Sequence, residues 1–471
     1  MTQTSKNPGP RLTAIVLAGG KGTRMKSPLP KVLHPVAGVP MILRAVKALQ
    51  GAGTSEIRLV VGHGQGLVRQ VLESTGVQFF EQKEQLGTAH AVSCAQVDSL
   101  EGEVLIMNGD HPLITTEDIK NLVESFRELK ADVAVVTAIV KKPGDLGRII
   151  RQKNQLRAIV EAKDASADTL KIREINTGLY IVKATLLQEL LPKIKNENSK
   201  KEYYLTDLIL LALEAGKSVQ ALRTSSRVAH GVNQQSELAM ATRYVFKKKA
   251  QKLMEEGVLI MNPSAVYIEE AVEVGAGSVI YPHVFLRGKT KIGSFCVLEP
   301  QVFISDSTLG QSVQVRQGSY LEKAEVHNNC SVGPYARLRP ETVLMDEVHI
   351  GNFVELKKTK MGKRSKAAHL TYLGDAEIGE DCNIGCGAIT VNYSADKQKH
   401  KTKIGNRTFV GSDVQLIAPI EVGDDVILGA GSVITKSVPD KALAVARSKQ
   451  TVIPNYREKK NKTSSSQNEE N

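Results

Sequence analysis

A six-residue period runs through the second half of the chain and restricts its fold more than any other feature. From Val274 onward an aliphatic residue recurs every six positions, with a few steps of five, and after one gap the spacing resumes and ends at Ile434. Of the 27 positions in this register, 24 are Val, Ile or Leu. The residue two places earlier is mostly small or β-branched, and the residue that follows is often glycine. This pattern is typical of hexapeptide repeats, which fold as a parallel β-helix with three short strands per triangular coil.

The repeat predicts about nine coils, and it also predicts which side chains stack. Residues 17 or 18 apart lie on the same face of successive coils, separated by the usual strand spacing of about 4.8 Å. Leu338, Leu356, Leu373 and Thr390 form one inward column of this kind. Its outward neighbours are Arg339, Lys357, Tyr372 and the pair Asn392-Tyr393. Stacked cations repel unless an anion lies between them, so this edge suits a phosphate.

Two further features lie beside this column. His369 precedes Tyr372 at the adjoining corner, and residues 357–366 carry six positive charges and no acid. For any one of these residues a solvated basic corner is the simpler interpretation, whereas the whole group favours a binding site. The repeat is interrupted once, between Thr390 and Ile404, by a polar, basic segment that we expect to leave the prism as a loop. Insertions from rigid scaffolds often carry function.

The cysteines indicate neither disulfides nor zinc. There are five of them, with no CxxC pair. Cys296, Cys330 and Cys382 fall in the small inward column, where a buried free thiol acts as a modest hydrophobe. Cys94 lies in an expected helix, and Cys386 lies at a corner of the prism.

The first half of the chain alternates strand and helix patterns. This rhythm favours a parallel, doubly wound sheet covered on both faces, which binds ligands beyond the carboxyl ends of its strands. The expected strands are 12–18, 57–63, 77–80 and 103–110, and the expected helices are 40–51, 65–75, 87–97 and 116–130. The stretches LAGGKGTR and NGD stand at two of the strand ends.

The loop LAGGKGTRMKSPLPKVLH, residues 17–34, is glycine-rich and basic but fits neither common phosphate motif. A dinucleotide fingerprint would need glycine where Met25 stands, and a Walker loop would end in Gly-Lys-Ser/Thr rather than Lys21-Gly22-Thr23. Its glycines could instead simply allow a tight turn.

A long helix joins the two halves. Residues 234–256 contain neither Gly nor Pro, and Gly257 follows them. We therefore expect four segments, at 1–233, 234–257, 258–456 and 457–471, of which the first is an α/β domain, the second a helical linker, the third the β-helix and the last a disordered tail.

The amino-acid composition indicates which classes of ligand the protein binds. A formal net charge of +12 indicates anionic ligands. Aromatic residues make up only 4% of the chain and Trp is absent, which disfavours single-stranded nucleic acid and favours small phosphorylated molecules. The first residues lack the apolar run of a secretory signal, and the most apolar helical stretch, LTDLILLALEAG, is too short to span a bilayer. A cytoplasmic protein is expected.

Several motifs identify a family. The sequence contains KVLH, QLGTAHA, GDHPL, INTGLY, GVNQQSEL, RLRPE, HLTYLGDAEIG, NIGCGAITVNY and FVGSDVQLIAP. Together they resemble the bacterial bifunctional UDP-N-acetylglucosamine pyrophosphorylase/glucosamine-1-phosphate N-acetyltransferases over roughly residues 12–455. The resemblance implies a Rossmann-like nucleotidyltransferase domain and a left-handed β-helix that associates as a homotrimer. It also implies acetyl transfer from acetyl-CoA to glucosamine 1-phosphate, followed by uridylyl transfer from UTP with Mg²⁺. The product is a precursor of peptidoglycan and lipopolysaccharide.

The resemblance also implies roles for individual residues. In the first domain it implies contacts to UTP or the UDP-sugar by Leu17, Ala18, Gly19, Gly20, Lys21, Arg24, Lys31, Gln82, Gly87, Thr88, Asn108, Asp110, Gly147, Glu161, Asn176 and Asn233. Asp110 and Asn233 match the ligands of Mg²⁺. In the prism, His369 matches the catalytic base, and Arg339, Lys357, Tyr372 and Asn383 match contacts to the phosphosugar. Cys386, Asn392, Tyr393, Ser412, Ala430 and Arg447 match contacts to acetyl-CoA.

Two residues depart from the family pattern. Asn108 stands where relatives carry tyrosine, and Cys386 replaces a small, alanine-type residue. Three other functions compete with the bifunctional one: a single-function sugar-1-phosphate nucleotidyltransferase with a regulatory β-helix, an acetyltransferase with an inactive first domain, and a β-helix metalloenzyme or scaffold. The first would not need His369, the second would not need Asp110, and the third would need converging histidines, whereas His327, His349 and His369 occupy different phases of the repeat.

Overall fold

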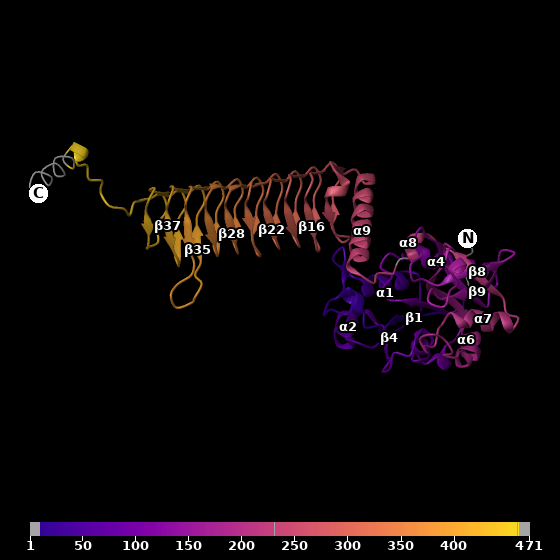
Figure 1. The fold of residues 1–471 in the computed structure, drawn as a ribbon. Coiled ribbons are helices and arrows are strands. Elements are labelled where there is room, and N and C mark those ends of the chain that lie inside the picture. Colours follow the sequence, from indigo (N-terminus) through magenta and orange to yellow (C-terminus); the bar gives the residue numbers. More distant parts are fainter. Residues whose placement is uncertain (1–9, 230, 459, 461–471) are drawn as a thin grey trace, which may run out of the picture. The chain divides into compact units, whose positions relative to one another are not determined.

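The computed structural model describes residues 10–229, 231–458 and 460. It divides into two compact units, Met1–Lys248 and Lys249–Asn471, and the division falls inside helix α9 (Gln235–Glu255). Figure 1 shows an α/β unit followed by a prism of short strands. Most of the predicted disordered tail, 457–471, lies outside the described residues.

The first unit is built on one nine-stranded sheet with the order β11-β7-β10-β6-β1-β4-β5, to which β8 and β9 attach beside β10. The strands are β1 (Leu12–Ala18), β4 (Glu56–Val61), β5 (Gln78–Glu81), β6 (Glu103–Asn108), β7 (Val133–Ile139), β8 (Arg148–Gln152), β9 (Gln155–Val160), β10 (Glu174–Lys183) and β11 (Val219–Arg223). The pair β2 (Pro35–Val36) and β3 (Val39–Pro40) is a separate small ribbon.

The sheet is mixed, which corrects the expectation of a parallel one. Strands β1, β4, β5 and β6 run parallel, as does the pair β7 and β11, but β10 is antiparallel to both β6 and β7. The chain reaches β10 through the antiparallel pair β8 and β9 instead of a helical crossover, so nothing forces β10 into the parallel direction.

Helices cover both faces of this sheet. Successive residues of a strand point to opposite sides, and accordingly Ala14 and Val16 pack in one core cluster while Ile15 packs in another. The first cluster includes residues of α1 (Met41–Gly51), α2 (Gln65–Leu72) and α4 (Thr116–Glu128), and the second includes residues of α3 (Thr88–Ser93), α6 (Ala184–Leu190) and α7 (Asp207–Glu214). Shorter helices are α5 (Ala167–Leu170) and α8 (Ser226–Ala229).

The described residues also contain six 3₁₀ helices: η1 (Thr23–Met25), η2 (Lys31–Leu33), η3 (Glu73–Thr75), η4 (Val97–Ser99), η5 (Leu191–Lys193) and η6 (Pro263–Ala265). The four helices and four strands expected from the sequence are all present, although α3 ends at Ser93 instead of continuing to 97.

The second unit is a prism of three parallel sheets, to which each coil contributes one strand apiece. The first sheet contains β12 (Leu259–Ile260), β15 (Val279–Ile280), β18 (Val297–Leu298), β21 (Gln314–Val315), β24 (Ser331–Val332), β27 (His349–Asn352), β30 (Lys366–His369), β33 (Asn383–Ile384), β36 (Phe409–Val410), β39 (Ile427–Leu428) and β41 (Leu443–Ala444).

The second sheet contains β13 (Tyr267–Ile268), β16 (Phe285–Arg287), β19 (Phe303–Ser305), β22 (Tyr320–Glu322), β25 (Arg337–Leu338), β28 (Glu355–Lys357), β31 (Tyr372–Gly374), β34 (Ile389–Val391), β37 (Gln415–Ile417) and β40 (Val433–Ile434). The third contains β14 (Glu273–Val274), β17 (Lys291–Ile292), β20 (Thr308–Leu309), β23 (Glu325–Val326), β26 (Val343–Leu344), β29 (Lys360–Met361), β32 (Ala376–Ile378), β35 (Thr402–Ile404) and β38 (Ile420–Val422).

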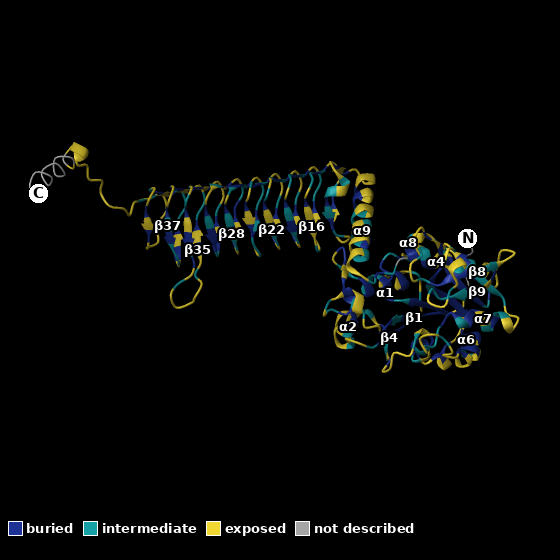
Figure 2. Ribbon diagram, in the orientation of Figure 1, coloured by how far each residue is buried: buried dark blue, intermediate teal, exposed yellow. Residues whose placement is uncertain are grey.

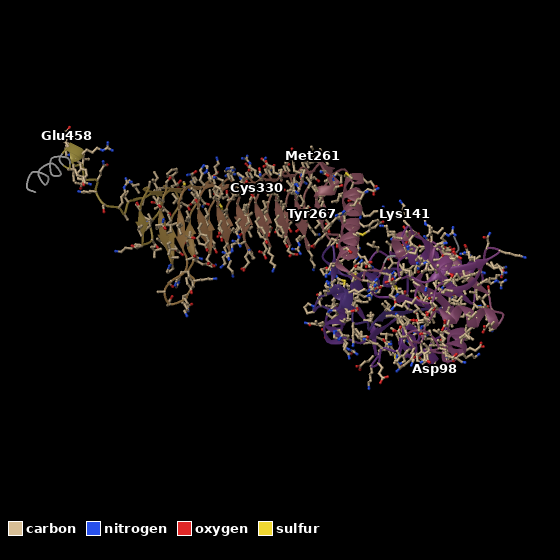
Figure 3. All side chains as sticks on the ribbon, in the orientation of Figure 1. Asp98, Lys141, Met261, Tyr267, Cys330 and Glu458 are labelled. Atoms are coloured by element: carbon tan, nitrogen blue, oxygen red, sulfur yellow. The ribbon has the colours of Figure 1, made fainter. Side chains whose placement is uncertain are left out.

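The prism confirms the repeat register. All 27 predicted inward positions, from Val274 to Ile434, are buried, including the three that are not Val, Ile or Leu. Burial alternates along most of the short strands (Figure 2), because successive residues of a strand point to opposite faces of its sheet. Cys296, Cys330 and Cys382 are buried free thiols as predicted, and Cys330 lies midway along the prism (Figure 3). The predicted loop leaves the prism between β34 and β35 (Figure 1).

Candidate functional site

A cleft of about 290 Å³ opens at the carboxyl ends of β1 and β6. Ten of the predicted nucleotide contacts line it: Leu17, Ala18, Gly19, Gly20, Lys31, Gln82, Gly87, Thr88, Asn108 and Asp110. The parallel register places Leu17 beside Asn108, so the two loops that follow these strands meet at one edge of the sheet. The cleft is also lined by Val32, Gln85, Ala91 and Glu202. The first three lie in the motifs KVLH and QLGTAHA, but no role was predicted for any of the four.

The loop after β1 approaches its neighbours too closely for larger residues. A Cβ atom on Gly62 would lie 2.8 Å from the Gly19 carbonyl oxygen. Gly22 has a φ of +61°, and a Cβ there would lie 2.6 Å from the Cβ of Lys31. Gln85 donates a hydrogen bond from Nε2 to the Gly19 oxygen at 2.7 Å. These contacts shape the loop so that its backbone borders the cleft.

Asp110 and Asn233 are linked by a lysine. The ammonium of Lys31 donates hydrogen bonds to Asp110 Oδ2 and, at 3.1 Å, to Asn233 Oδ1. Arg24 Nη2 donates to the same Asn233 oxygen at 3.0 Å, and its Nη1 lies 3.8 Å from Asp145. Burial alone would raise the pKa of Asp110, but the charges of Lys31 and His111 outweigh it and leave the pKa below its ordinary value. Asp110 is therefore an anion at neutral pH.

The same two residues fit a hard divalent cation. Asp110 Oδ1 is buried without a hydrogen-bond partner among the described residues. A carboxylate and a carboxamide oxygen are ligands that Mg²⁺ accepts, and this ion is usually held by one or two protein ligands together with phosphates. No group of three or more His, Cys, Asp or Glu residues suited to a metal occurs in the described part of the chain. A site shared with a phosphate ligand is consistent with both facts.

A second group of predicted residues lies beside the cleft. Asn176 donates from its backbone N–H to the Gly147 oxygen at 2.9 Å, and a Cβ on Gly147 would lie 3.4 Å from Glu161 Oε1. Burial raises the pKa of Glu161, and the charges of Asp164 and Asp207 raise it further, although Lys200 and a hydrogen bond from Thr206 oppose them. Lys21 is exposed on the loop after β1, outside the residues that line the cleft.

On the prism, the predicted residues border the second sheet. Arg339 follows β25, Lys357 ends β28, and the two residues share one corner of the prism. Arg339 donates a hydrogen bond to Glu355 at 2.9 Å. The side chain of Lys399, from the loop after β34, contacts Lys357, and this contact, with some burial and the charge of Arg339, lowers the pKa of Lys357. Three cations therefore gather at this corner. Lys399 was not predicted, because nothing in the sequence shows that its loop folds back.

His369 lies at the opposite corner of the same sheet, at the end of β30, and is exposed. Tyr372 begins the intervening strand β31 and pairs in register with Glu355. A Cβ on Gly374 would lie 2.5 Å from the Tyr372 hydroxyl and 2.7 Å from Asn392 Nδ2, so these two polar groups converge over this glycine. Asn392 also donates to Asp375 at 2.5 Å.

Three of the predicted acetyl-CoA contacts lie along the corner that bears His369, whereas Asn392 and Tyr393 follow β34 at the other corner of the second sheet. Cys386, Ser412 and Ala430 occupy the His369 corner in successive coils: Asp413 N–H donates to the Cys386 oxygen at 2.7 Å, and Gly431 N–H donates to the Ser412 oxygen at 2.8 Å. Arg447 donates to the Ala430 oxygen at 2.8 Å. Asn383 lies on β33 beside Lys366, and Tyr393 is exposed and bridged to Lys399 within the loop.

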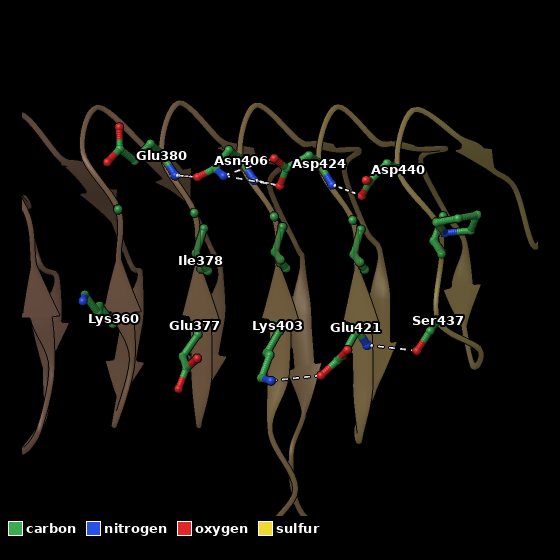
Figure 4. Close-up of a pocket in the computed structure, with 18 of the residues that line it drawn as sticks. Lys360, Glu377, Ile378, Glu380, Lys403, Asn406, Glu421, Asp424, Ser437 and Asp440 are labelled. Atoms are coloured by element: carbon green, nitrogen blue, oxygen red, sulfur yellow. Dashed lines mark hydrogen bonds and ion pairs between the residues drawn. The ribbon is translucent and has the colours of Figure 1, made fainter.

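A larger groove of about 850 Å³ lies elsewhere on the prism and contains none of the predicted residues (Figure 4). Its side chains serve the coils themselves. Asn406 accepts from Glu380 N–H, Asp424 from Asn406 N–H and Asp440 from Asp424 N–H, each at 2.8 Å (Figure 4). Lys403 and Glu421 form an ion pair at 3.0 Å. These contacts join successive coils of the prism, so the polar side chains of the groove have a structural role.

Three family models match parts of this chain. Residues 14–168 match the family described as a MobA-like NTP transferase domain, residues 262–366 the GMPPB C-terminal domain, and residues 401–436 the bacterial transferase hexapeptide of six repeats. A solved structure of UDP-glucose pyrophosphorylase complexed with UDP-glucose covers 50% of this chain and 99% of its own, at 18% identity and a TM-score of 0.43. None of the helices in the described ranges has the length and hydrophobicity of a membrane span.

Whole-length relatives are far more similar. The bifunctional protein GlmU of Bdellovibrio bacteriovorus is 64% identical over 445 residues, which make up 94% of this chain and 97% of that protein. The bifunctional protein GlmU of Pelobacter propionicus is 45% identical over 445 residues, 93% of this chain and 96% of that protein. Because this identity extends through both the nucleotidyltransferase unit and the hexapeptide prism, the chain belongs to the family of bifunctional GlmU proteins.

Proposed function

We propose that this enzyme makes UDP-N-acetylglucosamine in two steps at two separate sites. The prism, residues 258–456, transfers acetyl from acetyl-CoA to glucosamine 1-phosphate. The α/β domain, residues 1–233, then transfers uridylyl from UTP to N-acetylglucosamine 1-phosphate, and residues 234–257 link the two. The observation that carries the proposal is that His369 and the cations Arg339 and Lys357 flank one face of the prism, in the chain that also holds the cleft of Lys31 and Asp110.

In the uridylyl step, an oxygen of the sugar phosphate attacks the α-phosphorus of UTP and pyrophosphate leaves. Both reactants are anions, so positioning and positive charge supply most of the catalysis. Lys21, Arg24 and Lys31 neutralise the phosphates, Gln82, Gly87 and Thr88 contact the uridine, and Gly147, Glu161 and Asn176 contact the sugar. Asp110 and Asn233 hold Mg²⁺, which neutralises phosphate charge when bound.

In the acetyl step, the sugar amine attacks the thioester carbonyl of acetyl-CoA, a C–N bond forms, and the C–S bond breaks to release CoA. His369 takes the proton from the amine, a role that suits imidazole near neutral pH. Arg339 and Lys357 bind the phosphate of the sugar, and Tyr372 and Asn383 orient it. Cys386, Asn392, Tyr393, Ser412, Ala430 and Arg447 border the path of CoA.

We also propose that three prisms associate, which would complete each acetyl-transfer site. A row of stacked aromatic rings on the second sheet supports an interface there. Ring centroids of Phe303 and Tyr320 are 4.5 Å apart and those of Tyr267 and Phe285 are 4.4 Å apart, and Phe285 and Tyr320 are exposed in the single chain. We further propose a cytoplasmic location, because the proposed reactions use acetyl-CoA and UTP.

Two assays on the purified protein test the proposal. CoA release is measured with glucosamine 1-phosphate and acetyl-CoA, and pyrophosphate release is measured with UTP and N-acetylglucosamine 1-phosphate. His369→Ala is expected to abolish only CoA release, and Asp110→Ala only pyrophosphate release. Loss of both activities in either variant would contradict the division between two sites, and an unmodified protein that releases no CoA would favour a single-function nucleotidyltransferase.

A further inference from the structure

Two strands of the first prism sheet are longer than their neighbours. Strands β27 (His349–Asn352) and β30 (Lys366–His369) each have four residues, whereas β24 and β33 on either side have two. The extra pairing carries the ladder to the corner, where Asn352 and His369 become register partners. Asn352 is therefore fixed opposite the proposed catalytic base by the backbone itself.

Glycine makes this extension possible. A Cβ atom on Gly351 would lie 1.8 Å from the carbonyl oxygen of Ala368, a separation that no side chain could tolerate. Beyond this close approach, Leu370 N–H donates to the Asn352 oxygen at 3.0 Å. The backbone on both sides of the Asn352–His369 pair is thus held by direct contacts.

The two side chains are hydrogen-bonded. Asn352 Oδ1 lies 2.6 Å from His369 Nδ1. An amide oxygen can only accept, so this contact requires the proton on Nδ1, and a neutral imidazole then carries its lone pair on Nε2. Among the described residues no hydrogen bond involves Nε2, and His369 as a residue is exposed.

We propose that Asn352 is a positioning residue for acetyl transfer, which holds His369 in the tautomer whose Nε2 can accept a proton. The inference rests on the proposed role of His369 as the base. When the amine nitrogen bonds to the thioester carbon, its proton moves to Nε2 and the electron pair of the C–S bond leaves with CoA. The Nδ1–H bond to Asn352 stays in place and orients the imidazolium until it returns the proton to the thiolate.

The strands of this pair carry two other titratable residues, His349 and Lys366. His349 lies on the strand of Asn352, and burial, together with the charges of Arg316, Lys366 and His369, lowers its pKa from the ordinary 6.5. His349 is therefore neutral above pH 6.5, where it adds no charge to the surroundings of His369. Lys366 is on the strand of His369, and Arg316 follows β21.

The pH dependence of acetyl transfer tests this role in Asn352→Asp and Asn352→Leu. Aspartate keeps the acceptor and adds a negative charge, which stabilises the imidazolium and moves the acid limb of kcat/KM upward by roughly 1 pH unit. Above that limb Asn352→Asp should retain activity within a few fold of the unmodified enzyme. Leucine removes the acceptor, so kcat should fall about 10- to 100-fold with little change in KM for either substrate.

Matched measurements separate a folding defect from a positioning defect. Uridylyl transfer should be unchanged in both variants, and Gln314→Glu, which adds one carboxylate to the same sheet two strands before β27, should leave the acid limb where it is. An Asn352→Leu enzyme with unchanged kcat would overturn the proposal. So would an Asn352→Asp enzyme as slow as the leucine variant, since that result means that the amide nitrogen donates to Nδ1. If His369→Ala retains acetyl transfer, the proposed base itself is wrong, whatever Asn352 does.

Discussion

Lys31 donates a hydrogen bond from its ammonium to the carboxylate of Asp110, the residue proposed to hold Mg²⁺. The same ammonium reaches Asn233 Oδ1 at 3.1 Å. In the free enzyme a protein cation therefore bonds Asp110 Oδ2 and Asn233 Oδ1, and leaves Asp110 Oδ1 without a hydrogen-bond partner among the described residues. A phosphate ligand would offer Lys31 other acceptors and release these oxygens. Binding of the metal and of the nucleotide should therefore be coupled, and by linkage the coupling acts equally in both directions.

Lys31→Met is expected to bind Mn²⁺ more tightly than the unmodified enzyme when no nucleotide is present. The substitution removes an ammonium that competes for the ligands and repels the ion, and the gain should be roughly 10-fold. Electron paramagnetic resonance of free Mn²⁺ measures the binding without reference to activity. In the same variant uridylyl transfer should fall about 100-fold, because the phosphates lose a cation.

The matched control is Lys120→Met, which changes the net charge equally at an exposed position of α4. It should leave Mn²⁺ binding unchanged, and Asp110→Asn should weaken it. If Lys31→Met and Lys120→Met bind Mn²⁺ alike, Lys31 does not occupy the metal site. If Asp110→Asn binds as well as the unmodified protein, the metal lies elsewhere.

The sequence predicts the prism almost completely, because a six-residue period leaves one way to bury a single column on each face. Thr390 and Ala367 depart from the aliphatic pattern, yet both are buried at their expected places. The sequence predicts the first domain less completely. The run INTGLYIV in β10 predicts a strand, but its residues do not show whether the strand runs parallel or antiparallel to its neighbours. Its antiparallel pairing follows from the connection that precedes it.

The candidate sites show a similar limit. The family motifs assigned roles to Lys31, which begins η2, to Asp110, which follows β6, and to His369, which ends β30. They did not name Asn352 or Lys399. The position of Asn352 depends on a close backbone approach at Gly351, and that of Lys399 on a loop that folds back to Lys357. Neither contact produces a repeating pattern in the sequence.

Glu161→Gln is expected to weaken sugar binding in uridylyl transfer while it stabilises the fold. Burial and the charges of Asp164 and Asp207 raise the pKa of this carboxyl, so its ionised form is unfavourable in the folded protein at neutral pH. A neutral amide removes that cost. Loss of a charged hydrogen bond to a sugar hydroxyl should raise KM for N-acetylglucosamine 1-phosphate about 10-fold or more, with kcat less affected.

The pH dependence follows from the same shift. Because the folded-state pKa lies above the ordinary 4.5, the ionised carboxylate is lost as the pH falls toward that value from above, and KM for the sugar phosphate should rise there. The stability difference between Glu161→Gln and the unmodified protein should shrink over the same range, since both side chains are then neutral. A KM that follows the same pH profile in both proteins would remove Glu161 from the sugar site.

Gly351→Ala should disrupt acetyl transfer through the backbone. The added Cβ would meet the Ala368 oxygen at 1.8 Å, so β27 and β30 must separate near the corner that holds His369. We expect acetyl transfer to fall at least 10-fold and thermal unfolding to shift to lower temperature, with uridylyl transfer retained. Gly66→Ala in α2 is the control, because nothing lies within 4 Å of its added Cβ. Full acetyl transfer in Gly351→Ala would show that the corner does not need this geometry.

Alkylation of the chain by a bulky maleimide should stop acetyl transfer through Cys386 alone. Cys386 is exposed at the corner where acetyl-CoA is proposed to bind, so an adduct there would block the path of the thioester. The other thiols of the prism are protected: burial raises the pKa of Cys330 to about 11 and also raises the pKa of Cys296 and Cys382, which leaves little thiolate to react.

Cys386→Ala restores a small residue and should keep acetyl transfer near that of the unmodified enzyme while making it resistant to the reagent. Uridylyl transfer should be unaffected in both proteins, because Cys94, in the first unit, is half-buried and its pKa is also raised. If the reagent still inhibits Cys386→Ala, a prism thiol other than Cys386 opens to solvent. If alkylation of Cys386 leaves acetyl transfer by the wild-type enzyme unchanged, acetyl-CoA does not pass Cys386.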